Sequence, residues 1–143
     1  AIAATIDKPS PDPSLPPLIF LHGIGGAARA WRGQLAFLGE RYRAIAWDMP
    51  GYGGSVPLDK VSIAALAGAL KDFLDDVGAI KPTIVGHSIG GMIVQQWLTK
   101  YAAKARAVGL AQTSPAFRKA DGDWQKSCIS ARPGPPDRGQ PQA

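Results

Sequence analysis

The chain has 143 residues and a formal net charge of +5, with 45% hydrophobic and 19% charged residues, which suits one folded domain or part of a larger one. This composition excludes an intrinsically disordered or collagen-like protein. The basic residues are scattered and form no stripe with interleaved aromatics, so we expect no nucleic-acid partner. Apolar runs are too short to span a bilayer, so we expect no membrane association. The single cysteine, Cys128, excludes an intrachain disulfide and favours a reducing, cytoplasmic setting.

Short apolar runs separated by turn residues predict an alternation of strands and helices. In chain order, we expect a strand at 18–21, a helix at 29–38, a strand at 44–47, a helix at 63–77, a strand at 83–85, a helix at 92–101 and a strand at 107–111. Ser62 suits the N-cap of the second helix, and Gly78 suits its end. The strands are apolar without alternation, which is typical of strands buried on both faces. The sequence therefore predicts an α/β fold with a mostly parallel sheet and helices on both faces.

Proline is concentrated at both ends of the chain. We therefore expect a loose N-terminal segment at 1–16, with little that could pair with the sheet, and a folded core at 17–115. Residues 116–143 are polar at first and then rich in proline and glycine, which predicts an irregular segment.

The strongest chemical signal is a G-x-S-x-G motif at 86–90, between a predicted strand and a predicted helix. A serine on such a sharp turn is held in a strained conformation, and glycines two residues to either side let the backbone close around it. The following helix directs its free N–H groups at the position where an oxyanion forms during acyl transfer. The motif indicates a nucleophile elbow at Ser88.

A second glycine-rich segment, H-G-I-G-G at 22–26, follows the first predicted strand. Its glycines let the backbone approach a ligand, and one N–H of this loop can serve as the second oxyanion donor. The alternatives are a turn without a role or a phosphate cradle, although neither the Walker pattern nor G-x-G-x-x-G is present. We expect His22 to order this loop through hydrogen bonds. His87 adjoins Ser88 on a tight turn, where neighbouring side chains point apart, so we do not expect it to be the base.

Together, the segments at 22–26, 48–55 and 86–91 resemble the α/β-hydrolase superfamily, in particular its bacterial esterase and enol-lactonase-like branch. The resemblance implies a partial α/β-hydrolase fold at 17–115, with 116–143 as the start of a cap, and without the C-terminal strands and most of the cap. It implies that Ser88 is the nucleophile and that the backbone N–H groups of Ile24 and Ile89 form the oxyanion hole. It also places His22, Gly23 and Gly25 in a substrate-binding loop, and Asp48 in a turn outside the triad.

The chain departs from this family after Ser88. The family's triad follows the order serine, acid, histidine, yet no histidine follows Ser88, and the acidic residues Asp121, Asp123 and Asp137 come too early to match. We therefore expect little activity from this chain alone. A four-stranded partial sheet also leaves an edge uncovered, so we expect self-association.

Two functions remain open on the sequence. The first is a serine hydrolase that acts on small carboxylic esters or lactones through an acyl-enzyme and needs no cofactor or metal. The alternative is a non-catalytic remnant, or a binding or assembly module, that retains the nucleophile elbow.

Overall fold

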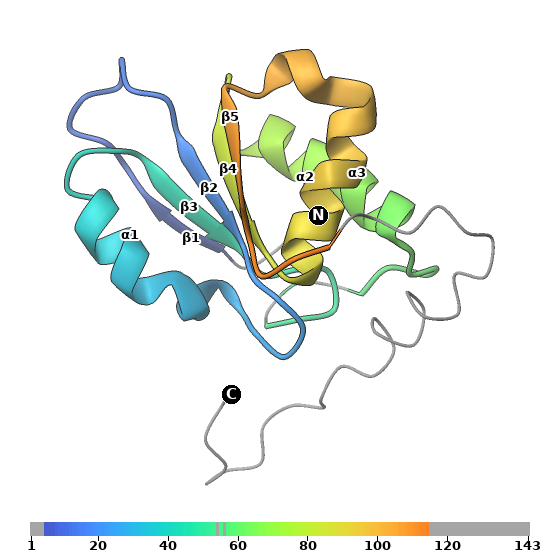
Figure 1. The fold of residues 1–143 in the computed structure, drawn as a ribbon. Coiled ribbons are helices and arrows are strands. Elements are labelled where there is room, and N and C mark those ends of the chain that lie inside the picture. Colours follow the sequence, from blue (N-terminus) through green and yellow to red (C-terminus); the bar gives the residue numbers. More distant parts are fainter. Residues whose placement is uncertain (1–4, 54, 56, 115–143) are drawn as a thin grey trace, which may run out of the picture.

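The computed structural model describes residues 5–53, 55 and 57–114, which form a five-stranded sheet in the order β1-β3-β2-β4-β5 (Figure 1). Strands β2 to β5 run parallel to one another, whereas β1 is antiparallel to β3. Their bounds are β1 Thr5–Lys8, β2 Leu18–Leu21, β3 Ala44–Trp47, β4 Thr83–His87 and β5 Ala107–Ala111. The strands predicted at 18–21, 44–47 and 107–111 are confirmed at both ends, and β4 extends two residues beyond the predicted 83–85.

Strand β1 corrects the expectation that residues 1–16 contain little that could pair, and with it the expected four-stranded sheet. Ile6 pairs with Ala46 in antiparallel register, and Asp7 forms an ion pair with Arg43, with 2.7 Å between Oδ2 and Nη2. Sequence reasoning missed this strand because it has one large apolar residue, and its pairing depends on backbone hydrogen bonds to β3. The domain boundaries remain predictions, and residues 116–143, with Asp121, Asp123 and Asp137, lie outside the described residues.

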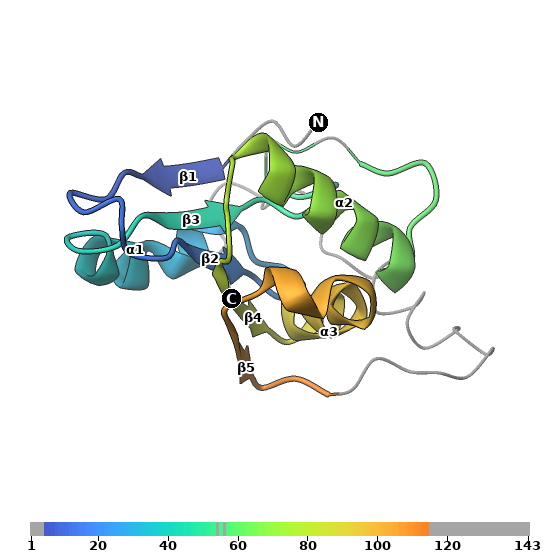
Figure 2. The ribbon, with the colours of Figure 1, turned by 90° about the horizontal axis from the view of Figure 1, so that it is seen from above.

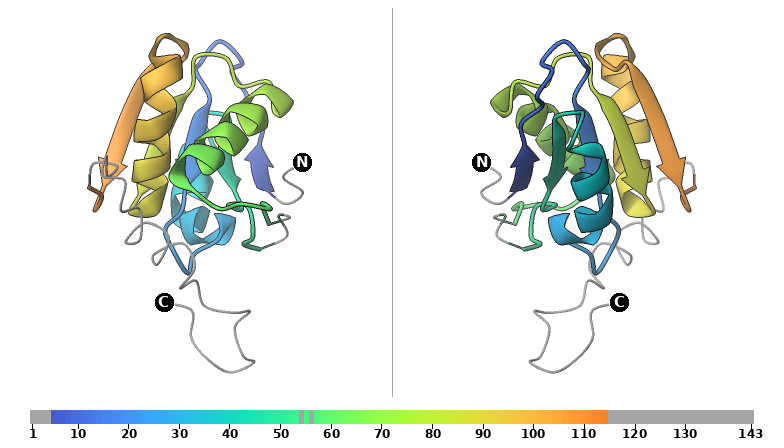
Figure 3. Two further views of the ribbon diagram at one scale, coloured as in Figure 1. Left: turned by 90° about the vertical axis from the view of Figure 1, so that its right-hand side faces the viewer. Right: turned by 90° about the vertical axis from the view of Figure 1, so that its left-hand side faces the viewer.

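Helices cover both faces of the sheet, as predicted. Figures 2 and 3 show α1 on one face and the pair α2 and α3 on the other. The helical segments are η1 Ala28–Trp31, α1 Arg32–Leu38, α2 Ile63–Asp76, α3 Ile89–Tyr101 and η2 Ala102–Lys104. The N-cap prediction is confirmed, because the Ala65 N–H donates to Ser62 Oγ over 3.0 Å. Helix α3 begins at Ile89 and not at the predicted 92, because two glycines in its first turn interrupt the apolar periodicity.

The two helix layers explain why the strands lack alternation. Ile19, Ile45 and Trp47 face the larger core under α2 and α3, where Trp47 packs on Phe73 with 5.8 Å between ring centroids. The side chains between them, including Phe20, face a smaller core with α1. Both faces of each central strand are therefore buried, and each must be apolar.

The strand order indicates where in the sheet a ligand would bind. From β2 the chain moves to β3 on one side, and then crosses to β4 on the other side of β2 (Figure 1). Ligands of open α/β sheets bind outside the carboxyl ends of the strands at such a reversal. Residues 22–26, which follow β2, and Ser88, which follows β4, both lie at this position.

Candidate active site

Ser88 occupies the strained turn that the motif predicted. Its backbone has φ 56° and ψ −120°, in a region that residues with side chains seldom adopt. Residues at and just after the carboxyl end of β5 hold this conformation through both the N–H and the carbonyl group of Ser88. The Ser88 N–H donates to Ala111 O over 3.0 Å, and Thr113 Oγ1 donates to Ser88 O over 2.5 Å. The predicted nucleophile is thus fixed by the strand beside its own.

The motif glycines allow close contacts that a side chain would prevent. A Cβ on Gly86 would lie 2.6 Å from the backbone of Gly90, and a Cβ on Gly90 would lie 2.5 Å from Leu21 O. The first turn of α3 therefore packs directly on the end of β2. This packing brings the elbow against the loop that follows β2.

The loop at 22–26 lies against the elbow. A Cβ on Gly23 would lie 3.1 Å from Ser88 Cβ and 3.0 Å from His87 Nδ1. The Ile24 N–H donates no hydrogen bond within the described part of the chain. Ile89 is the first residue of α3, so its N–H has no carbonyl partner inside the helix. The structure thus brings the two predicted oxyanion donors to neighbouring segments, each with an N–H that no helix or turn uses.

His22 orders this loop, as predicted, and does so from a buried position. The Met49 N–H donates to His22 Nε2 over 2.9 Å, so the proton of the neutral ring is on Nδ1, which donates to Gly23 O over 2.8 Å. The loops after β2 and β3 are joined a second time, because the Ala28 N–H donates to Asp48 Oδ1 over 2.8 Å. Both ring nitrogens of His22 are occupied, so this histidine positions the loop.

The His22 geometry predicts a loss of stability in mild acid. Burial lowers the pKa of His22 below its ordinary value of 6.5, although the Gly23 carbonyl and the Asp48 charge oppose the shift. The unfolded chain therefore takes up the proton first as pH falls. The contribution of neutral His22 to the free energy of unfolding is complete above about pH 6.5. Below that pH it declines by at most about 1.4 kcal/mol per pH unit, until the pH falls below the pKa of His22 in the folded chain. Urea unfolding between pH 7.5 and 5.5 measures this slope.

The matched variant is His22→Gln, which has no titrating group. Its urea midpoint is expected to vary less over the same range. An equal pH dependence in both proteins would contradict the assignment to His22.

Neither histidine of the chain is placed to activate Ser88. His87 Nε2 donates to Gln112 Oε1 over 3.0 Å, which directs that nitrogen toward the loop after β5. Within the described residues, no hydrogen bond joins Ser88 Oγ to either imidazole. The expectation that His87 is not the base agrees with this arrangement.

Sequence reasoning missed the residues that brace the elbow from α3 and from the end of β5. Gln95 Nε2 donates to Gly91 O over 3.1 Å and to Ser114 O over 3.0 Å. Its spacing of four residues from Gly91 is the only sequence signal for this role. The contacts of Thr113 with Ser88 and of Ser114 with Gln95 depend on pairing of β4 with β5, which no local pattern reveals.

The chain also matches a known protein family. The alpha/beta hydrolase fold family matches residues 16–128 of the chain. The chain belongs to the alpha/beta hydrolase family. Two curated relatives illustrate what the chain is similar to. It is 35% identical over 99 residues to the dihydrolipoyllysine-residue acetyltransferase component of an acetoin cleaving system from Cupriavidus necator, covering 68% of this chain and 26% of that protein. It is 30% identical over 98 residues to a protein of Escherichia coli O127:H6 provisionally named carbamate hydrolase RutD. This match covers 67% of this chain and 37% of that protein.

The fold is also that of a thermophilic esterase from Thermogutta terrifontis, with a TM-score of 0.76 and 22% identity. That likeness covers 90% of this chain and 47% of the esterase. The chain therefore spans a quarter to about a third of the two curated relatives and under half of the solved structure.

Two kinds of feature are absent from the described residues. No cluster of three or more histidine, cysteine or acidic side chains there is arranged to hold a metal ion. No helix in the same residues is long and apolar enough to cross a membrane.

Proposed function

We propose that this chain carries the nucleophile half of a serine hydrolase for small carboxylic esters or lactones. A base takes the Ser88 hydroxyl proton, Oγ bonds to the carbonyl carbon, and the oxyanion accepts hydrogen bonds from the Ile24 and Ile89 N–H groups. The ester C–O bond then breaks, and the proton passes to the departing alcohol oxygen. Water adds to the acyl-enzyme by the same route and releases the acid.

The observation that carries the proposal is the left-handed backbone of Ser88 beside the 22–26 loop. A strained serine costs stability and is retained where the surrounding structure holds it, as Ala111 and Thr113 do here. Serine at this position favours acyl transfer over a mechanism with a carboxylate nucleophile. Because one relative of the chain is provisionally named as a carbamate hydrolase, a substrate with an acyl carbonyl suits the site. Within the 22–26 loop, we propose that His22, Gly23 and Gly25 shape the wall nearest the substrate.

The second candidate is a binding or assembly module that retains the elbow without chemistry. It is favoured by one observation, that both histidines of the chain are hydrogen-bonded elsewhere. Chemical labelling distinguishes it from the first proposal.

A fluorophosphonate probe tests the nucleophile, with covalent mass gain measured on the intact chain. We expect slow modification at Ser88, because no imidazole accepts its proton, and faster modification when free imidazole is added as an external base. Ser88→Ala is expected to lose this adduct in both conditions, whereas Ser114→Ala keeps it.

Two results would count against the hydrolase proposal. Modification that persists at full extent in Ser88→Ala would show that another side chain reacts. A folded sample without any Ser88 adduct, even in imidazole, would favour the binding or assembly module.

A further inference from the structure

A cavity of about 620 Å³ lies at the end of the sheet opposite Ser88, next to the amino ends of the strands. Its wall includes residues within two positions of the start of four strands: Pro17 before β2, Arg43 before β3, Lys81 before β4 and Arg106 before β5. Those are the amino ends of the parallel strands, whereas Ser88 follows a carboxyl end. The cavity is therefore separate from the candidate active site, and its volume is in the range of small-molecule sites.

Backbone hydrogen bonds fix the floor of this cavity. The Leu18 N–H donates to Arg43 O over 2.8 Å, the Thr83 N–H to Pro17 O over 2.9 Å, and the Arg106 N–H to Pro82 O over 2.9 Å. Prolines line much of the wall, and their φ angles are already restricted. A ligand would thus meet a largely preformed site and would lose little affinity to ordering it.

The wall combines apolar surface with positive charge. Leu15, Ile80 and the prolines at 9, 13, 16 and 17 supply the apolar part, and the Ile80 side chain is 81% exposed. Three of the twelve lining residues are cationic, and none is acidic. A ligand with an apolar body and an anionic end complements this combination.

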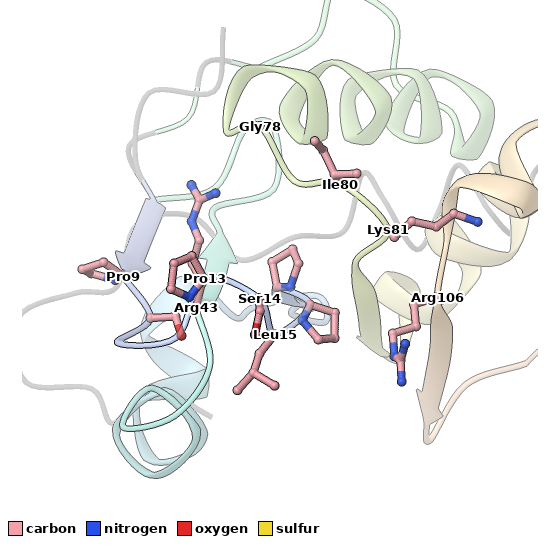
Figure 4. Close-up of a pocket in the computed structure, with 12 residues that line it drawn as sticks. Pro9, Pro13, Ser14, Leu15, Arg43, Gly78, Ile80, Lys81 and Arg106 are labelled. Carbon is pink, nitrogen blue, oxygen red and sulfur yellow. The ribbon is translucent and has the colours of Figure 1, made fainter.

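The three cations differ in availability. Asp7 already neutralises Arg43 through two contacts of 2.7 and 3.1 Å. Lys81 Nζ donates to Ala103 O over 2.7 Å, which leaves two of its three N–H donors for another partner. The guanidinium of Arg106 has no ion pair within the described residues. Figure 4 shows Lys81 and Arg106 on one side of the cavity, with Pro9, Pro13 and Arg43 on the other, and the Lys81 ammonium directed away from the cavity toward its partner Ala103 O.

We propose that this cavity binds a small organic anion with an aliphatic body, whose carboxylate pairs with Arg106 and whose chain lies on Ile80, Leu15 and the prolines. This site goes beyond the proposed hydrolase function, and its occupation does not depend on Ser88. Arginine is the main anchor, because its guanidinium can form two parallel hydrogen bonds to one carboxylate.

Titration of the full chain with sodium octanoate, followed by amide NMR shifts and by calorimetry, tests the site. We expect shifts at Gly78, Ile80, Lys81 and Arg106, and much weaker binding of the neutral probe 1-octanol. Arg106→Gln is expected to weaken octanoate binding about fivefold, as the loss of one charge-assisted carboxylate contact would. Acetate, which lacks the aliphatic body, is expected to bind far more weakly than octanoate.

The matched control is Arg29→Gln, which removes one exposed arginine beyond the carboxyl end of β2. It changes the net charge equally and is expected to leave octanoate affinity unchanged, as is Ser88→Ala. Three results would overturn the proposal: shifts confined to the residues around Ser88, equal binding of 1-octanol, or an equal loss of affinity in Arg29→Gln.

Discussion

Gly90→Ala is expected to destabilise the fold by about 3 kcal/mol, because the added Cβ collides with backbone and not with a side chain that can move. That Cβ would lie 2.5 Å from Leu21 O and 2.9 Å from His22 O. Relief requires α3 to move away from the end of β2, which also separates Ser88 from the 22–26 loop. Chemical denaturation measures the free energy of unfolding, and Ser88 labelling measures the effect on the site.

The matched control is Gly68→Ala in α2. Gly68 is exposed, and a Cβ there would meet nothing within 4 Å. Alanine is the better helix former, so this variant is expected to gain about 0.5–1 kcal/mol. Equal effects of the two substitutions would show that the close contact at Gly90 is not what requires glycine there.

The chain by itself is expected to hydrolyse p-nitrophenyl butyrate on the order of 10⁴-fold or more below an intact serine esterase. Removing the catalytic histidine of a triad typically costs about 10⁶-fold in kcat, and what remains comes from binding and the oxyanion hole. Here His22 donates to Gly23 O and accepts from Met49, and His87 donates to Gln112. Initial rates of the purified chain, compared with Ser88→Ala, measure the deficit.

Turnover close to that of an intact esterase, lost in Ser88→Ala, would contradict this expectation. It would mean that a base reaches Ser88 Oγ within this chain. His22→Gln and His87→Gln would then identify which imidazole acts, since each removes one of the two histidines.

The sequence predicted elements that depend on local interactions, and it missed elements that depend on contacts between residues distant in the chain. The strand at 44–47 was predicted at both ends because its apolar character comes from burial by two helix layers, which affects every residue of the strand. The Ser62 cap was predicted because its partner, Ala65, is three residues away. Strand β1 and the first turn of α3 were missed, because neither has an apolar pattern and both depend on neighbours distant in sequence.

The sequence alone determined the fold class and the position of the elbow, because apolar strands and closely spaced glycines act through local backbone geometry. It also indicated that His22 orders its loop. Only the tertiary structure decided what holds Ser88 in its strained conformation, since Ala111 and Thr113 reach it through the pairing of β4 with β5. The same holds for the cavity at Arg106, which forms where the loops before four strands meet. Contacts of this kind depend on strand order, and strand order is a property of the assembled sheet.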